Sequence, residues 1–189
     1  RLVAKGKVRY CGISNETPYG VMKFCQLAEK DSSLPRIISL QNSYSLLSRS
    51  LYEGGLSEVC SPRNENVGLM AYSPLAGGIL TGKYFNPKVA ANSRLNLFKG
   101  YMSRYKQSLA VEAVAEYVRV ARTFGLSPTE LSLAWCYEQD SVASTIIGAT
   151  TLDQLQENIN AYDKVDAITT ELKDAVDKVY QKYTDPSKI

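Results

Sequence analysis

The chain has 189 residues, of which 44% are hydrophobic and 22% are charged, and its formal net charge is +3 at pH 7. This length can bury one good core or two small ones. The nearly balanced charge excludes a strongly basic arm, so we expect no nucleic-acid partner. No apolar run approaches the ~20 residues that cross a bilayer, and no charged-then-apolar leader opens the chain. We therefore expect neither a membrane segment nor a secretory signal.

Two residue types restrict the chemistry. Histidine is absent, so this chain cannot supply an imidazole as base, acid or metal ligand. The four cysteines are scattered, form no C-x-x-C pair and have no metal-ligand spacing; they are Cys11, Cys25, Cys60 and Cys136. This pattern indicates buried thiols in a reducing compartment. We therefore expect a cytoplasmic protein without a metal.

Predicted strands and helices alternate along the chain. Four short apolar runs without strict alternation are typical of strands buried in a parallel sheet, at 8–14, 36–42, 67–73 and 143–149. Helical patterns fall between and after them: from Thr17-Pro18 onward, over 52–60, over 109–124 with Gly125 as the stop, from the capping box at Ser127 through Trp135, from Thr151 to about Asp163, and from Thr169 or Thr170 to about Val179.

The longest helical pattern also predicts a buried face. In 109–124 the expected apolar stripe consists of Val111, Val114, Ala115, Val118 and Ala121. The segment 74–108 that precedes it has no clean period and is rich in Gly, Pro, Asn and Ser, which is typical of a long functional loop. Its apolar residues either line a substrate pocket or pack the loop down; they are Phe85, Leu97, Phe98 and Tyr101.

The order of elements predicts an α/β fold with right-handed crossovers, one parallel sheet and outer helices. Four strands cannot close a barrel, and no G-x-G-x-x-G follows a strand, which weakens a doubly wound nucleotide-binding fold. A (β/α)8 barrel takes about 250 residues. Four units therefore predict one domain, residues 1–189, that is half of such a barrel. Since the chain opens without Met, we expect the polypeptide to begin well upstream.

Polar or aromatic residues follow the ends of all four predicted strands. These ends are Ser14-Asn15, Gln41-Asn42, Tyr72-Ser73 and Gly148-Ala149-Thr150. An amide side chain can pair with a carboxamide, a tyrosine ring can stack on a flat heterocycle, and a helix N-terminus can hold a phosphate. The set indicates a dinucleotide site. The alternative is that the two asparagines form turns, Gln41 is a satisfied polar group and Tyr72 is a core aromatic.

Four ordered motifs carry a specific resemblance. Residues 6–15 (GKVRYCGISN), 40–49 (LQNSYSLLSR), 71–84 (AYSPLAGGILTGKY) and 146–158 (IIGATTLDQLQEN) are similar in order and spacing to the aldo-keto reductase superfamily. The branch that they resemble includes the potassium-channel β subunits and related reductases. The resemblance implies the C-terminal half of a (β/α)8 TIM barrel, strands five to eight.

The resemblance also implies an NADP site. At the nicotinamide it places Ser14, Asn15, Gln41 and, stacked on the ring, Tyr72. At the pyrophosphate it places Ser73, Leu75, Gly77 and Lys83, with Arg94 near a phosphate. At the adenosine end it places Gly148, Thr150, Gln154, Glu157 and Asn158.

The spacing at the adenosine end has a physical reason of its own. Thr150, Gln154 and Asn158 recur every four residues, so they share one helix face beside the positive end of its dipole. That arrangement suits a ribose 2′-phosphate and favours NADP over NAD. The alternative is that Thr151 and Gln154 only form a capping box.

The chain departs from the family's sequence pattern at the catalytic residues. The family's catalytic residues are Asp, Tyr, Lys and His, and this chain has neither a histidine nor an Asp-x-x-x-x-Tyr-Gly motif. We therefore assign no catalytic residue. The resemblance implies NADP(H)-dependent reduction of small aldehydes or ketones by a longer protein, and this chain by itself is expected to be inactive.

Three further expectations remain open. The chain could be a non-catalytic, nucleotide-binding regulatory subunit. Residues 77–84 (GGILTGKY) nearly spell a P-loop, but they lack the Ser or Thr that holds Mg²⁺. A half-barrel leaves its sheet edges open, so we expect the missing N-terminal half or a second copy to cover them.

Overall fold

A four-stranded parallel sheet forms the centre of the chain, for which a computed structural model describes residues 1–90, 93–98, 100 and 102–186. The strands are β1 (Cys11–Ser14), β2 (Ile37–Ser43), β3 (Gly68–Tyr72) and β4 (Val142–Ile146). They pair in the order β1-β2-β3-β4, and every pairing is parallel. The predicted α/β class is confirmed, and the sheet is consistent with part of a (β/α)8 barrel.

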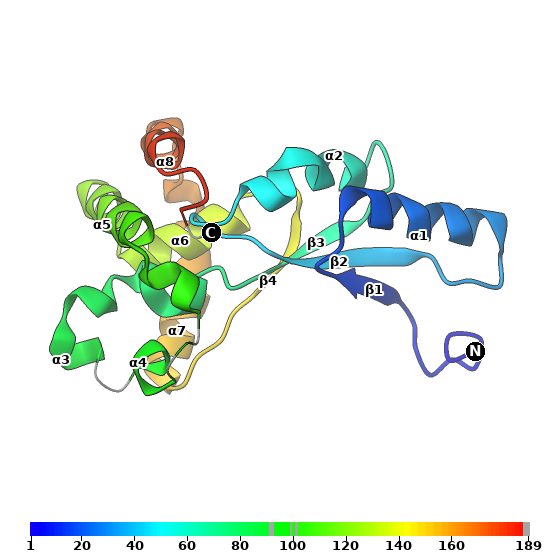
Figure 1. The fold of residues 1–189 in the computed structure, drawn as a ribbon, viewed down its shortest axis with the longest axis horizontal. Helices are drawn as coiled ribbons and strands as arrows, with labels where there is room; N and C mark the ends of the chain where they lie inside the picture. Colours follow the sequence, from blue (N-terminus) through cyan, green and yellow to red (C-terminus); the bar gives the residue numbers. More distant parts are fainter. Residues whose placement is uncertain (91–92, 99, 101, 187–189) are drawn as a thin grey trace.

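Helices follow each strand, as the sequence predicts. The longer ones are α1 (Pro18–Lys30), α5 (Ser108–Thr123), α6 (Pro128–Tyr137), α7 (Leu152–Asn160) and α8 (Thr170–Lys182). Between β2 and β3 the chain forms a π-helical turn η1 (Tyr52–Leu56) that continues into α2 (Ser57–Cys60). A 3-10 helix η5 (Ala161–Ala167) joins α7 to α8. Figure 1 shows α1 and α2 along one side of β1–β3, and α5, α6 and α8 gathered at the other end of the molecule.

Side-chain caps fix where these helices begin. The Thr17 hydroxyl accepts a hydrogen bond from the Gly20 N–H at 3.1 Å at the start of α1. At the start of α6, the Glu130 N–H donates to Ser127 Oγ at 3.1 Å and the Ser127 N–H donates to Glu130 Oε2 at 2.7 Å. Each cap satisfies N–H groups that have no partner within the helix. The predicted capping box is therefore confirmed.

The segment after β3 is more regular than the sequence indicates. Residues 74–108 are expected to form a loop, but the part of this segment that the structure describes contains short helical pieces: η2 (Ala76–Thr81), η3 (Lys83–Phe85), α3 (Pro87–Ala90), α4 (Arg94–Leu97) and η4 (Ser103–Lys106). Within η2 the helix is interrupted at Gly77 and Gly78, which have positive φ. Helices of three to six residues give no period that a sequence pattern can detect. Phe85, Leu97 and Phe98 are exposed, and Tyr101 lies outside the described residues.

The two faces of the sheet differ in character. Leu40 on β2 pairs in register with Leu69 on β3, and both are fully buried beneath the helices. On the opposite face the neighbouring row is Ser14, Gln41 and Met70, and none of these three is buried. The described residues therefore build their core on the helical side only.

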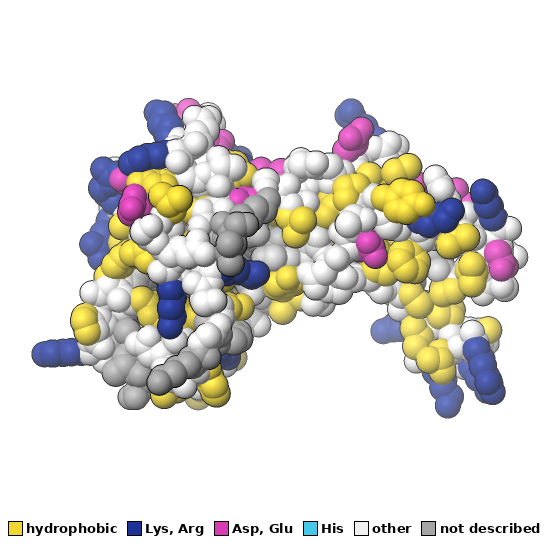
Figure 2. Space-filling view, in the orientation of Figure 1, with side chains coloured by type: hydrophobic (Ala, Val, Ile, Leu, Met, Phe, Trp, Pro, Cys, Tyr) yellow, Lys and Arg dark blue, Asp and Glu magenta, His cyan; other side chains and the backbone are white. Residues whose placement is uncertain are grey.

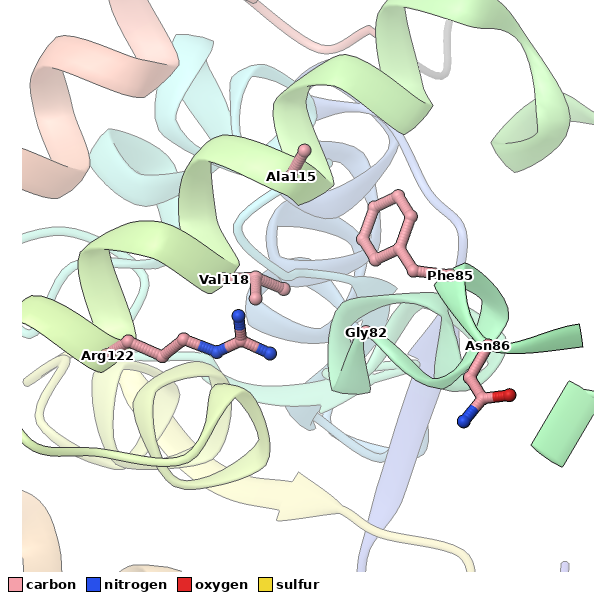
Figure 3. Close-up of a pocket in the computed structure, with 6 residues that line it drawn as sticks. All are labelled: Gly82, Phe85, Asn86, Ala115, Val118 and Arg122. Carbon is pink, nitrogen blue, oxygen red and sulfur yellow. The ribbon is translucent and has the colours of Figure 1, made fainter. Parts of the chain in front are cut away.

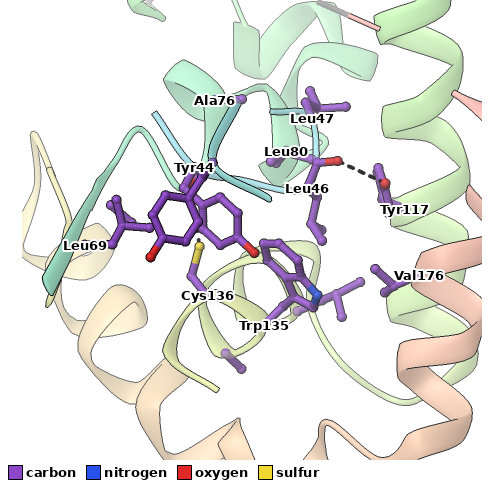
Figure 4. Close-up of a cluster of buried hydrophobic side chains, with 14 of the residues drawn as sticks. Tyr44, Leu46, Leu47, Leu69, Ala76, Leu80, Tyr117, Trp135, Cys136 and Val176 are labelled. Atoms are coloured by element: carbon purple, nitrogen blue, oxygen red, sulfur yellow. Dashed lines mark hydrogen bonds between the residues drawn. The ribbon is translucent and has the colours of Figure 1, made fainter. Parts of the chain in front are cut away.

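A dense aromatic cluster joins the segment after β2 to α5 and α6 (Figure 4). The Tyr44 and Trp135 rings stack with centroids 5.1 Å apart. The buried Tyr117 hydroxyl donates a hydrogen bond to the Leu46 carbonyl at 3.0 Å. Offset aromatic pairs and satisfied buried carbonyls both stabilise a core.

Two observations concern the helices as possible membrane spans and the cysteines as possible disulfide partners. No described helix has both the length and the hydrophobicity required to cross a membrane. All four cysteines are free, and Cys25, Cys60 and Cys136 are buried. Burial raises the pKa of the Cys136 thiol to about 12, so this thiol is protonated at neutral pH.

Apolar side chains remain exposed near the β1 end of the sheet, where Figure 2 shows hydrophobic groups on the surface. On α1 they include Tyr19, Met22, Phe24 and Leu27. In the described residues β1 pairs with β2 alone, so its other edge is open. An open strand edge beside exposed apolar residues is a surface on which further protein can pack.

We predict that Tyr117→Phe destabilises the full-length protein by about 1–3 kcal/mol, because the buried Leu46 carbonyl loses its partner. Urea denaturation measures the change. Tyr162→Phe is the matched control: Tyr162 is 68% exposed, so its loss of a hydroxyl should leave the free energy of unfolding nearly unchanged. Equal effects of both substitutions would contradict the role given to Tyr117.

Candidate functional site

Four predicted residues meet at the carboxyl ends of β1, β2 and β3. The Tyr72 hydroxyl donates to Asn15 Oδ1 at 2.8 Å, and Asn15 Nδ2 donates to Ser14 Oγ at 3.2 Å. Ser14 Oγ in turn donates to the Gln41 carbonyl at 3.0 Å. The structure therefore brings Ser14, Asn15, Gln41 and Tyr72 together through one chain of hydrogen bonds.

The backbone explains how they meet. Ser14 pairs with Gln41, and Ser43 pairs with Tyr72, so adjacent parallel strands end at nearly the same level. Asn15 lies just beyond β1 with φ +55°, and its N–H donates to the Gln41 carbonyl at 3.0 Å. Asparagine tolerates this left-handed conformation better than most residues. Asn15 is thus a turn residue, and its side chain also lies within the cluster.

The segment after Tyr72 has an unusual backbone. Ser73, Ala76, Gly77 and Gly78 all have positive φ, between +49° and +90°. Alternation of left- and right-handed residues can turn successive N–H groups towards one side, which forms a concave anion site. Lys83 lies close by, since a Cβ on Gly78 would be 3.0 Å from its Nζ.

The residues predicted at the adenosine end also meet. Asn158 Nδ2 donates to the Gly148 carbonyl at 3.2 Å, so the last turn of α7 holds the turn that precedes the helix. Gln154 Oε1 accepts from the Thr150 N–H at 3.0 Å and from its hydroxyl at 3.1 Å. Thr151 caps α7 by accepting from the Gln154 N–H at 3.3 Å. Thr151 therefore caps α7, but the reciprocal half of a capping box is replaced, because Gln154 Oε1 accepts from Thr150. Gln154 and Asn158 lie on α7, whereas Thr150 lies just before its N-cap.

The two groups are neighbours because β4 pairs with β3. Tyr72 is in register with Ile146, and Gly148 follows two residues later. Gly148 and Thr150 lie beyond the end of β4, which is shorter than the predicted run 143–149. Leu75 is partly buried between Ser73 and η2. Arg94 is the first residue of α4 and is exposed.

One contact of a predicted site residue was not predicted from the sequence. Ser127 Oγ donates to Glu157 Oε1 at 3.5 Å, which links the start of α6 to the face of α7. The capping box at Ser127 is visible in the sequence, but no local pattern shows that Glu157, thirty positions later, lies beside it. Such a contact requires the packing of α6 on α7.

A hollow among the described residues lies elsewhere, between η2–η3 and α5 (Figure 3). It has a volume of about 370 Å³ and is lined by Gly82, Phe85, Asn86, Ala115, Val118 and Arg122. None of these is a predicted cofactor-binding residue, but Phe85 is one of the residues expected either to line a substrate pocket or to pack the loop down. In the described part of the chain, no group of three or more His, Cys, Asp or Glu side chains is arranged to hold a metal ion.

Comparison with known proteins identifies the family. The model of the Aldo/keto reductase family matches residues 1–181. The chain belongs to this family. Protein tas of Escherichia coli is 46% identical over 96% of the chain, and an aldo-keto reductase of Babesia bovis is 40% identical over the whole chain. A probable voltage-gated potassium channel subunit beta of rice is 30% identical over 95% of the chain.

These relatives are longer than the chain. The match spans 51% of protein tas, 66% of the Babesia protein and 55% of the rice protein. The chain thus covers about half to two thirds of the relatives it matches.

We predict that Gly77→Ala destabilises the full-length protein more than Gly125→Ala does. Both positions have φ near +70°, which costs a residue with a side chain about 1–2 kcal/mol. Only at Gly77 would the new methyl also meet a neighbour, Met102 Sδ at 2.5 Å. Urea denaturation of both variants compares the two positions, and a larger loss for Gly125→Ala would contradict the close packing of this segment.

Proposed function

We propose that this chain forms the cofactor-binding half of an NADP(H)-dependent oxidoreductase that reduces small aldehydes or ketones to alcohols. The observation that supports it best is the hydrogen-bonded cluster of Tyr72, Asn15, Ser14 and Gln41 beside the turn that opens α7. In a chain of the Aldo/keto reductase family, such a cluster at the strand ends is where a dinucleotide would bind.

The nicotinamide end fits this cluster chemically. The amide of Asn15 and the hydroxyl of Ser14 offer both donors and acceptors, which a carboxamide requires. The Tyr72 ring is partly exposed and stands at the end of β3, so its face can stack on a planar heterocycle. NADP(H), when bound, would supply the hydride, and these residues would orient its ring.

The phosphates would lie along the segment after β3. The positive φ values at Ser73 and at Ala76, Gly77 and Gly78 turn the backbone sharply here, and the two glycines let a ligand approach the backbone N–H groups without a side chain in between. Lys83 adds a positive charge beside Gly78. Ser73, Leu75, Gly77 and Lys83 are therefore the residues that we propose for the pyrophosphate.

The proposed preference for NADP over NAD depends on the charges near the adenosine end. Residues 148–158 contain no Lys or Arg but include Asp153 and Glu157. Among the residues proposed for the site, Lys83 and Arg94 are the only cations. A ribose 2′-phosphate carries extra negative charge, so its recognition would depend on Arg94 together with the amide of Gln154.

The proposed substrate is a small carbonyl compound. One relative, from Escherichia coli, is named L-glyceraldehyde 3-phosphate reductase and is 33% identical over 90% of the chain. This chain contains no histidine, and we assign none of its residues to proton transfer. The rest of the barrel would pack against the open β1 edge and the exposed apolar side chains of α1.

A second candidate function is cofactor binding without turnover. It is favoured by the similarity to the rice protein named as a probable potassium channel subunit beta. The two functions differ in one measurable outcome. Both require NADPH binding by the full-length protein, but only the oxidoreductase consumes NADPH when an aldehyde is added.

We predict that Arg94→Ala weakens NADPH binding to the full-length protein about 10- to 100-fold and changes NADH binding less than about twofold. Loss of a hydrogen bond to a charged group costs about 1.5–3 kcal/mol, and 1.4 kcal/mol corresponds to a factor of ten. Gln154→Ala should show the same preference with a smaller effect. Titration of nucleotide fluorescence gives the dissociation constants of NADPH and NADH for the unaltered protein and for each variant.

Arg122→Ala is the control for this titration, because it removes the same charge at a residue that lies on α5 beside the hollow of Figure 3. It should leave both dissociation constants unchanged. If Arg94→Ala weakened NADPH and NADH equally, the proposed contact with a 2′-phosphate would be wrong. If the unaltered protein bound neither nucleotide, the proposed function itself would fail.

A further inference from the structure

The segment that follows β2, residues 44–50, is held by an arginine whose side chain is largely buried. The side chain of Arg49 is only 13% exposed, and its guanidinium donates to Glu53 Oε1 at 2.9 Å and to Asp177 Oδ1 at 2.6 Å. The same guanidinium lies 4.3 Å from the Tyr180 ring centroid and 5.1 Å from that of Trp135. A charge that is this little exposed requires partners on every side.

The residues after α8 return to the same segment. Asp185 is 4% exposed and accepts hydrogen bonds from the Arg49 N–H at 2.8 Å, from the Ser50 N–H at 3.2 Å and from the Ser50 hydroxyl. Its own backbone is left-handed, with φ +42°. A non-glycine residue keeps such a conformation only when the surrounding contacts outweigh the strain. Asp185 therefore fixes the turn at Arg49–Ser50.

Contacts continue from this turn to the hydrogen-bonded cluster of Ser14, Asn15, Gln41 and Tyr72. Tyr44 stacks on Trp135, and its hydroxyl donates to Glu53 Oε1 at 2.8 Å, the same oxygen that accepts from Arg49. The Tyr44 N–H donates to the Tyr72 carbonyl at 3.3 Å. Figure 4 shows Tyr44 between the strand that carries Leu69 and the ring of Trp135. Tyr44 also lies three residues after Gln41.

We propose that Asp185 and Arg49 are positioning residues for the nicotinamide end of the site. The tail after α8 holds residues 44–50, and this segment, through Tyr44, sets the position of Tyr72 and Gln41. The proposal rests on the proposed function. The adenosine end does not depend on these contacts, because α7 is capped by Thr151 and is tied to its own turn through Asn158 and Gly148.

This difference between the two ends allows a sharp test in the full-length protein. Asp185→Ala should weaken NADPH binding at least tenfold. Adenosine 2′,5′-bisphosphate lacks the nicotinamide, so its dissociation constant should change less than twofold. Asp185→Asn keeps one acceptor oxygen and should fall between the unaltered protein and the alanine variant. The control is Asp174→Ala, which removes an exposed carboxylate from α8 and should affect neither ligand.

Each outcome of these binding measurements either supports or overturns a stated role. NADPH binding that stays unchanged in Asp185→Ala overturns the proposal, and so does an equal loss for both ligands, which would show general destabilisation. If Asp185→Ala fails to fold, Ser50→Ala removes only one donor to Asp185, and it must still weaken NADPH more than the bisphosphate. If the unaltered protein bound neither compound, the proposed function, and not the positioning role, would be at fault.

Discussion

The parallel register of the four strands is the constraint on which the candidate site depends. Parallel neighbours end at the same edge of the sheet, and Ser14 pairs with Gln41 while Tyr72 pairs with both Ser43 and Ile146. Four segments that together span more than a hundred residues of sequence therefore place polar groups side by side. A slip of one residue in β2 would turn Gln41 to the helical side and bring Asn42 to the open face. Backbone pairing, rather than any single side chain, assembles the cluster.

The same segments serve the core and the site. β2 contributes Leu40 to the buried face and Gln41 to the open face, and the chain then enters the aromatic cluster at Tyr44. Because the Tyr44 N–H donates to the Tyr72 carbonyl, packing against Trp135 and hydrogen bonding at the strand ends are joined within a few ångströms. The stability of this region and the geometry of the site cannot vary independently.

Local signals explain which parts of the structure the sequence predicts. The caps at Thr17 and Ser127 and the four strands are confirmed, because each is encoded within a few neighbouring residues. The buried stripe of α5 is only partly right. Val114, Val118 and Ala121 are buried, but Val111 and Ala115 are exposed, and Ala110, Ala113 and Tyr117 are buried in their place. Which face of α5 is covered depends on α6 and α8, which a pattern within α5 cannot show.

The contacts between strand-end residues that lie far apart in the sequence could not be predicted from the sequence. Motif spacing singled out Asn15 and Tyr72, but their hydrogen bond crosses 57 positions, and that of Arg49 to Asp185 crosses 136. On the open face of the sheet, Ser14 is exposed and Gln41 is only partly buried, so both are accessible to a ligand or protein layer that covers this side. A face that carries donors and acceptors beside Met70, at the edge where the strands end, is suited to a polar ligand with several hydrogen-bonding groups. A dinucleotide has this character along its whole length, and the row from Gln41 through Tyr72 to Gly148 offers such groups along adjoining strand ends.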